Sequence, residues 1–160
     1  MIKKIKLYLD TSVISHLHQP DRPDWMELTL QLWDLFKTGK YEIILSNIMF
    51  EEIDACKKEK REILYDKLDE IVYTSVSANE EIEDIANEII KQGILKEKNR
   101  KDCRHIGCAI YSQSKYLVSW NIVDLANIET NEGVRRISSM LDYPFIQIIK
   151  PDYIVPKEDL

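Results

Sequence analysis

Short apolar segments that favour β-structure alternate with segments of helical periodicity along most of the chain, and this alternation limits the folds open to it. Strands are expected at Ile5–Leu9 and Tyr41–Leu45. Between them, apolar residues recur at helical spacing over Asp24–Lys37, and Gly39 is a plausible helix terminator. Repeated strand–helix units place successive strands in parallel, with helices on both faces of the sheet. The sequence therefore predicts an α/β fold.

The alternation continues to the end of the chain. After the second strand, Ser46 or Asn47 can cap a charged helical stretch that runs to about Glu70. The remaining expected elements are a strand at Ile71–Val76, helices at Asn79–Gln92 and Arg100–Ser114, a strand at Tyr116–Ser119, a helical turn or two at Val134–Leu141 and a strand at Phe145–Ile149. We expect a three-layer α/β/α sandwich with a mainly parallel, five-stranded sheet.

Length and composition favour one globular unit. The chain has 160 residues, of which 44% are hydrophobic, and this suffices for a single domain over residues 1–150 followed by a C-terminal tail over 151–160, which is polar and expected to be exposed from Asp152 on. No apolar run approaches the roughly 18 residues of a membrane helix. The 3 cysteines form no C-x-x-C pair. We expect a reduced, cytoplasmic protein that does not enter a membrane.

The charge balance argues against binding nucleic acid by bulk attraction. The chain carries 22 Lys and Arg against 28 Asp and Glu, a formal net charge of −6. A role on nucleic acid would need a recruited cation or a local basic patch. The best candidates for weak substrate contacts lie around the start of one helix, where a solvated helix end would look the same: Arg100, Lys101 and Arg104.

Polar residues that follow the expected strands carry the functional signal. Asp10 follows the first strand directly, Glu52 lies about one and a half helical turns beyond the second, and Asp102 opens the helix before the fourth. Asn121 and Asp124 follow that fourth strand. Ligands of open parallel sheets bind outside the carboxyl ends of the strands. Each residue also has an ordinary explanation, as a helix cap, a first-turn acid or a solvated side chain.

Together, these acids suggest a metal site. Carboxylates that converge on one pocket cannot all stay ionised without a cation. A set of oxygen ligands without His or Cys suits Mg²⁺ or Mn²⁺. Such a site can cleave phosphodiesters by lowering the pKa of a bound water and neutralising the leaving oxygen. Thr11 and Ser12, expected in the loop after the first strand, could reach a metal-bound water or a phosphate, or could simply cap the loop.

Four segments in order resemble the motif blocks of the PIN domain, best known from VapC-type toxin ribonucleases. The resemblance extends from residue 5 to about 150 and rests on Tyr8–Ile14, Leu45–Ile53, Asp102–Ala109 and Leu117–Leu125. It implies a PIN-like α/β/α nuclease that hydrolyses RNA as an endoribonuclease with Mg²⁺ or Mn²⁺. It further implies a homodimer and an antitoxin protein as partner.

The resemblance also assigns roles by position. Asp10, Glu52 and Asp102 match the first three acidic residues of the family and would hold the metal. The fourth catalytic position falls on Asn121, which departs from the family pattern, and Asp124 is near enough to substitute for it.

Other functions remain open on the sequence. A catalytically weak or inactive PIN-like module that binds RNA or protein would look similar. A phosphotransferase of the haloacid dehalogenase type expects a second Asp where Ser12 stands, and a dinucleotide-binding fold expects a glycine-rich turn after the first strand. His105 lies on the same helix face as Asp102 and could shuttle protons or support the structure.

Overall fold

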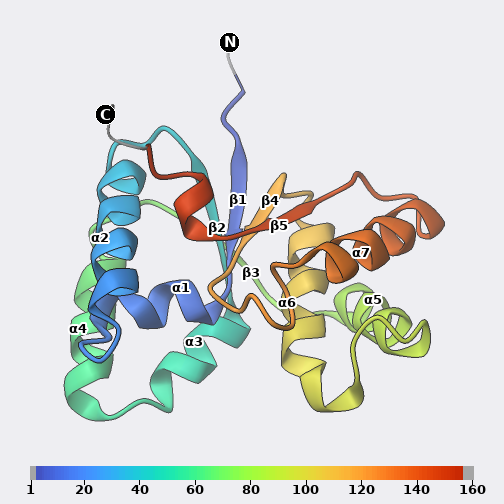
Figure 1. The fold of residues 1–160 in the computed structure, drawn as a ribbon, viewed down its shortest axis with the longest axis horizontal. Helices are drawn as coiled ribbons and strands as arrows, with labels where there is room; N and C mark the ends of the chain where they lie inside the picture. The colour runs from blue at the N-terminus through green and yellow to red at the C-terminus, as the bar shows by residue number, and fades with distance from the viewer. Residues whose placement is uncertain (1–2, 157–160) are drawn as a thin grey trace.

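A computed structural model describes residues 3–156 and confirms the expected α/β fold (Figure 1). One sheet of five parallel strands runs in the order β3-β2-β1-β4-β5. The strands are β1 (Lys6–Leu9), β2 (Glu42–Ser46), β3 (Thr74–Val76), β4 (Tyr116–Val118) and β5 (Gln147–Ile149). With β1 at the centre, the carboxyl ends of β1, β2 and β4 lie side by side.

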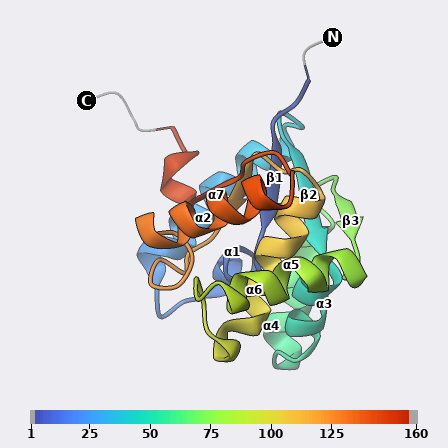
Figure 2. The ribbon, with the colours of Figure 1, turned by 90° about the vertical axis from the view of Figure 1, so that its right-hand side faces the viewer.

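Helices cover both faces of this sheet and give the expected three layers (Figures 1 and 2). One layer holds α1 (Thr11–Ser15), α2 (Pro23–Lys37), α3 (Asn47–Asp54) and α4 (Lys58–Leu68). The other holds α5 (Glu80–Lys91), α6 (Arg100–Tyr111) and α7 (Ile128–Met140). Three 3₁₀ turns complete the described elements: η1 (His16–His18), η2 (Glu97–Asn99) and η3 (Pro151–Tyr153).

Side-chain alternation in the central strand explains why both faces are covered. Tyr8 is buried against the core formed with α5, α6 and α7, whereas Leu7 and Leu9 are buried in the core on the side of α1 to α4. A strand without polar residues on either face can only lie between two apolar layers. Gly39 ends the turn after α2 with a φ of +77°, a left-handed conformation that glycine adopts without strain.

Three local expectations from the sequence are wrong. The charged stretch up to about Glu70 is two helices, α3 and α4, because the backbone of Lys57 is extended between them. This break lets α4 pack against α2, where the Trp33 indole donates a hydrogen bond of 2.8 Å to the carbonyl of Lys67. Thr11 and Ser12 lie in the short helix α1 instead of a loop. The helix expected from Val134 begins earlier, at Ile128.

The predicted tail begins with a segment that is exposed at Asp152 and Tyr153 and half-buried at Ile154 and Val155. Residues 151–153 form η3, Pro151 is buried, and Ile154 and Val155 pack against the core on the side of α2. Apolar residues interrupt the polar composition here, and their burial fixes the segment. Residues 157–160 of the predicted tail lie outside the described residues. Within residues 3–156, no helix combines the length and the apolar character that crossing a bilayer requires.

Candidate active site

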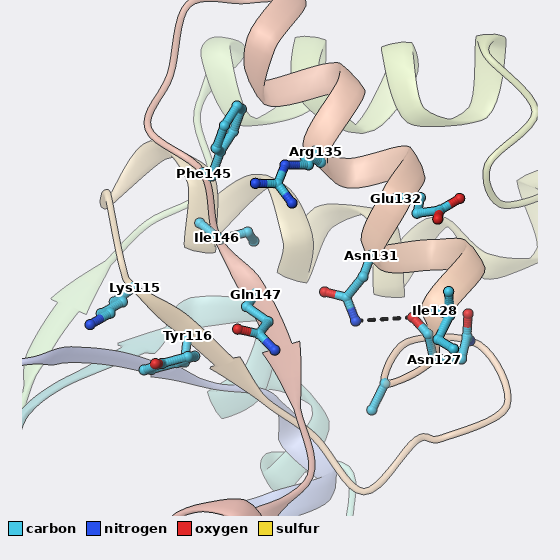
Figure 3. A pocket seen from close by; sticks show the side chains of 11 residues that line it. Lys115, Tyr116, Asn127, Ile128, Asn131, Glu132, Arg135, Phe145, Ile146 and Gln147 are labelled. Carbon is cyan, nitrogen blue, oxygen red and sulfur yellow. Dashed lines mark hydrogen bonds between the residues drawn. The ribbon is translucent and has the colours of Figure 1, made fainter.

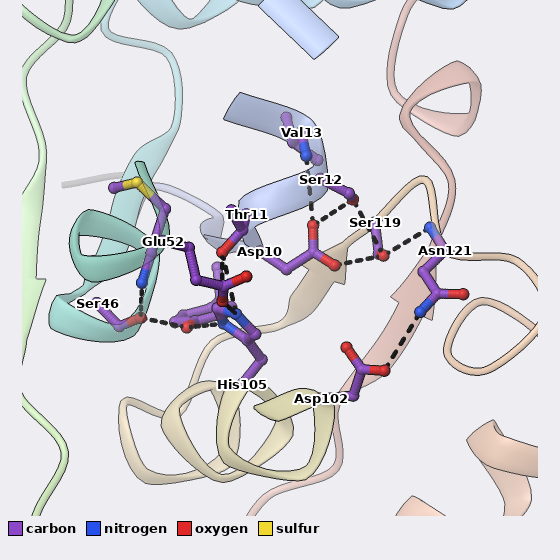
Figure 4. A network of polar contacts seen from close by, with 12 residues as sticks. Asp10, Thr11, Ser12, Val13, Ser46, Glu52, Asp102, His105, Ser119 and Asn121 are labelled. Carbon is purple, nitrogen blue, oxygen red and sulfur yellow. Dashed lines mark hydrogen bonds and ion pairs between the residues drawn. The ribbon is translucent and has the colours of Figure 1, made fainter. Parts of the chain in front are cut away.

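A cavity of about 340 Å³ opens at the carboxyl ends of the central strands, and three carboxylates line it (Figure 4). Asp10 comes from the end of β1, Glu52 from α3 and Asp102 from the first turn of α6. The other lining residues are Thr11, Ser12, Ser15, His16, Lys101, His105 and Asn121. The three sequence segments that carry the acids therefore meet in one place.

Asp10 is the most buried of these acids, at 3% exposure, and it also caps α1. Its Oδ1 accepts hydrogen bonds from Ser12 Oγ at 2.5 Å and from the backbone N–H of Val13 at 3.4 Å. Its Oδ2 accepts from Ser119 Oγ at 2.5 Å. Burial raises the pKa of Asp10, and these hydrogen bonds oppose the increase without cancelling it. Both oxygens thus have fixed positions.

The two serines also hold the loop after β4. Ser12 Oγ accepts a hydrogen bond from the backbone N–H of Trp120, and Ser119 Oγ accepts one from that of Asn121, each at 2.9 Å. Ser12 therefore links Asp10 to the backbone of Trp120, and Ser119 links Asp10 to that of Asn121, a contact that Figure 4 shows. Sequence reasoning assigned no role to Ser119. A polar residue that directly follows the apolar strand β4 was the available signal.

Glu52 is held by two side chains that reach the same oxygen. Thr11 Oγ1 donates to Oε1 at 3.0 Å, and His105 Nε2 lies 3.2 Å from it. Because a carboxylate only accepts, this histidine nitrogen is the donor. Burial acts to raise the pKa of Glu52, but the bonds from His105 and Thr11 outweigh it, so the pKa lies below its usual value.

A buried polar chain fixes the ring of His105. Its Nδ1 lies 2.6 Å from the hydroxyl of Tyr8, and this hydroxyl donates to Ser46 Oγ at 2.7 Å. Ser46 in turn caps α3, the helix that carries Glu52, by accepting from the backbone N–H of Met49. Burial raises the pKa of Tyr8 well above its ordinary value, so the phenol stays neutral at pH 7. These contacts hold the His105 ring beside Glu52.

The surroundings of Asp102 also raise its pKa. Burial, together with the negative charges of Asp10, Asp124 and Glu52, raises its pKa to about 6, although His105 opposes this. Asn121 Nδ2 donates to Asp102 Oδ2 at 3.3 Å, and Asn121 Oδ1 accepts from the backbone N–H of Asp124 at 3.2 Å. Asn121 thus lines the cavity beside Asp102, whereas Asp124 is not among its lining residues.

The donor set suits a hard divalent cation that keeps part of its water. In residues 3–156, no group of three His, Cys, Asp or Glu side chains is arranged to ligate one ion directly. Mg²⁺ commonly binds through one or two carboxylates and retains several waters, so it needs no closed cage. Burial, followed by the charges of the neighbouring carboxylates, raises the pKa of Asp102, and a cation at this position would favour its ionised form.

The three basic residues predicted to contact substrate lie in different surroundings. Arg100 pairs with both carboxylate oxygens of Glu97, at 2.5 and 2.7 Å, and Arg104 pairs with Glu83 at 2.6 Å. Neither lines the cavity. Lys101 does line it and forms no ion pair with a described residue. Of the three predicted residues, Lys101 is therefore the one that lies beside the carboxylates of the cavity.

A larger depression, of about 580 Å³, lies between α7 and β5 (Figure 3). Lys115, Arg135 and Phe145 line it, with the Arg135 guanidinium 4.8 Å from the centre of the Phe145 ring. Glu132 is its one acidic lining residue. It lacks the clustered carboxylates of the cavity at the strand ends, which is therefore the candidate active site.

Comparison with solved structures finds this fold in VapBC complexes. A chain in VapBC2 from Rickettsia felis, bound to a DNA fragment from their promoter, matches with a TM-score of 0.55 and 16% identity over 91% of this chain and 98% of that chain. VapBC-1 from nontypeable Haemophilus influenzae matches with a TM-score of 0.55 and 15% identity over 92% and 99%. No protein-family model and no curated protein sequence matches the chain. The likeness concerns the three-dimensional fold, and it confirms that this chain has the PIN-type fold expected from its four motif-like segments.

Proposed function

We propose that the protein is a Mg²⁺- or Mn²⁺-dependent endoribonuclease of the PIN type and the toxin of a toxin–antitoxin pair. The observation that carries this proposal is the convergence of Asp10, Glu52 and Asp102 on one cavity at the strand ends. Burial and, after it, the charges of the neighbouring carboxylates raise the pKa of Asp102 to about 6, and a bound divalent cation would favour its ionised form. The fold shared with VapBC chains supports the same class of function.

The surroundings of each carboxylate indicate its role in the proposed reaction. Asp10, Glu52 and Asp102 would hold the cation, directly or through its waters, with Asp10 fixed by Ser12 and Ser119. When bound, the cation supplies a water of lowered pKa and neutralises charge on the phosphate. Glu52 stays ionised at neutral pH because its pKa is lowered, so it can orient a water by accepting a hydrogen bond. Thr11 and His105 keep Glu52 in place for this role.

The proposed substrate is single-stranded or loop RNA. Unpaired segments expose phosphates and bases that a helix hides. The acidic protein offers few cations of its own at the cavity, of which Lys101 is one. The bound metal would therefore supply much of the attraction for a phosphate.

A panel of structured RNAs, incubated with purified protein and Mn²⁺, tests the activity. Wild-type protein is expected to cut at least one member within a loop, and EDTA or Asp10→Asn should abolish cutting. Glu51→Gln is the matched control, since Glu51 is exposed and does not line the cavity. Failure to cut any RNA, or equal cutting by Asp10→Asn, contradicts the proposal.

The proposed partners are an antitoxin protein and a second copy of the chain. A segment that enters an acidic cavity needs a cation, and Arg pairs well with carboxylates. We expect expression of the active protein to arrest growth unless the antitoxin is present, and Asp10→Asn protein to be harmless. Light scattering at micromolar concentrations tests the homodimer, and a monomer mass would exclude it in that range.

One observation favours a second candidate function, an RNA- or protein-binding module without turnover. Asn121 stands at the fourth acidic position of the family, so the cavity has one carboxylate fewer. Such a module would bind RNA with the same affinity in the presence and absence of Mn²⁺ and would cleave none.

A further inference from the structure

His16 lines the carboxylate cavity, although neither the strand-end pattern nor the motif resemblance singles it out. It begins η1, directly after α1, and its Nδ1 lies 2.7 Å from the backbone carbonyl oxygen of Ser12. A carbonyl oxygen only accepts, so Nδ1 must carry the hydrogen. This contact leaves Nε2 as the nitrogen available to a ligand.

Aromatic packing keeps the ring in this place. The His16 ring centre lies 5.4 Å from that of Trp25 and 6.0 Å from that of Trp120, and the two tryptophans stack on each other at 4.4 Å with an angle of 12°. The Trp120 indole also donates to Thr29 Oγ1 at 2.9 Å. The stacked tryptophans and the hydrogen bond of Nδ1 therefore hold the ring, and a pre-positioned group loses little entropy when it binds a ligand.

The hydrogen-bonding capacity of Nε2 is unused. It makes no hydrogen bond to a residue in the range 3–156. In the neutral ring, a hydrogen on Nδ1 makes Nε2 an acceptor. Phosphate oxygens are acceptors too and cannot satisfy it, whereas the ribose 2′-hydroxyl can donate to it. That hydroxyl is the group that distinguishes RNA from DNA.

We propose that His16 is a specificity-determining residue whose Nε2 accepts a hydrogen bond from a 2′-hydroxyl of the RNA strand bound at the cavity. The proposal rests on the proposed ribonuclease function and deepens it by naming how the site selects ribose. His18 provides a natural contrast, because it belongs to the same turn but does not line the cavity.

Binding measurements with matched oligonucleotides test this contact. The protein carries Asp10→Asn throughout to prevent cleavage, and the probes are a fluorescein-labelled RNA 12-mer from the cleaved loop and the DNA of the same sequence. The assay is run near pH 8. Adding His16→Ala is expected to weaken RNA binding about tenfold and to leave DNA binding unchanged.

Two further variants and a modified RNA test the contact between His16 and the 2′-hydroxyl more specifically. His16→Gln keeps an acceptor oxygen at similar reach and should recover part of the RNA affinity, whereas His18→Ala should alter neither affinity. A single 2′-deoxy substitution in the RNA should match the effect of His16→Ala at one position, and the two changes together should cost no more than either alone.

The outcomes separate this inference from the proposed function. Equal loss of RNA and DNA binding in the His16→Ala protein would assign the ring to a phosphate and overturn the inference, as would no loss with either probe. In both cases cleavage by the wild-type protein can stand. If the wild-type protein neither cleaves nor binds RNA, the proposed function itself fails, and the inference fails with it.

Discussion

Neutralising Asp102 should stabilise the metal-free protein although it damages the proposed site. The pKa of Asp102 in the folded protein is about 6, because of burial and the nearby charges of Asp10, Asp124 and Glu52. An Asp in an unfolded chain titrates near 3.9. A carboxyl whose pKa is raised by folding opposes folding wherever it is ionised. The Asp102→Asn variant removes this penalty and still offers an oxygen to the Nδ2 donor of Asn121.

The size of the effect follows from the two pKa values. Their difference corresponds to about 3 kcal/mol at full burial. Asp102 is only partly buried, so solvent screens the interaction, and we expect about half of this, about 1.5 kcal/mol. For a chain of this length, this raises the midpoint of thermal unfolding by about 3 to 6 °C. The penalty is complete above about pH 6 and vanishes below about pH 4, so the gain should shrink as the pH falls through that range.

Thermal unfolding in EDTA at several pH values between about 4 and 7.5 measures this gain over the titration range of the carboxyl. Glu51→Gln is the control, because it removes an exposed carboxylate that does not line the cavity. Saturating Mn²⁺ should reverse the order, stabilising the wild type more than Asp102→Asn. The reasoning is refuted if Asp102→Asn is no more stable than the wild type at the highest pH, or if its advantage persists unchanged in acid.

Three further predictions concern the fourth ligand position, the buried polar chain and the helix packing. Asn121→Asp adds a carboxylate to the cavity and should tighten Mn²⁺ binding about tenfold in calorimetry. Asp124→Ala should change the Mn²⁺ affinity less than about twofold. If Asp124→Ala has the larger effect, Asp124 occupies the fourth ligand position. Tyr8→Phe removes a buried hydroxyl and should lower the free energy of unfolding in urea by about 1 to 3 kcal/mol. An unchanged value would show that the hydrogen bonds of the Tyr8 hydroxyl do not stabilise the fold. Gly107→Ala places a methyl group 2.8 Å from the carbonyl oxygen of Ile82, so α5 and α6 must separate. We expect the free energy of unfolding in urea to fall by about 1 to 3 kcal/mol. Unaltered stability would contradict the close contact.

The sequence predicts the centre of the sheet well because the central strand is apolar on both faces. Leu7, Tyr8 and Leu9 carry no polar alternation, and this is typical of a central parallel strand. Once the strands are parallel, residues after their carboxyl ends must share one edge of the sheet. This topological rule brings Asp10 and Asn121 to the same cavity, although they are far apart in the chain.

The remaining features depend on information that periodicity does not contain. The helix α1 spans only Thr11–Ser15, too short to show a helical repeat. The break before α4 contains neither glycine nor proline, and tertiary packing decides it. Ser119 and His16 acquire their surroundings only when β4 and η1 come together beside β1. A sequence pattern records which side chains are present but not which distant side chain will fix their orientation.

Calorimetric titration with Mn²⁺ tests the central claim, that the carboxylates at the strand ends form a divalent-metal site. The wild-type protein and Glu51→Gln should bind Mn²⁺ with the same affinity. Asp10→Asn should bind at least about tenfold more weakly, because it removes the buried charge fixed by Ser12 and Ser119. Undiminished Mn²⁺ binding by folded Asp10→Asn protein would contradict the account.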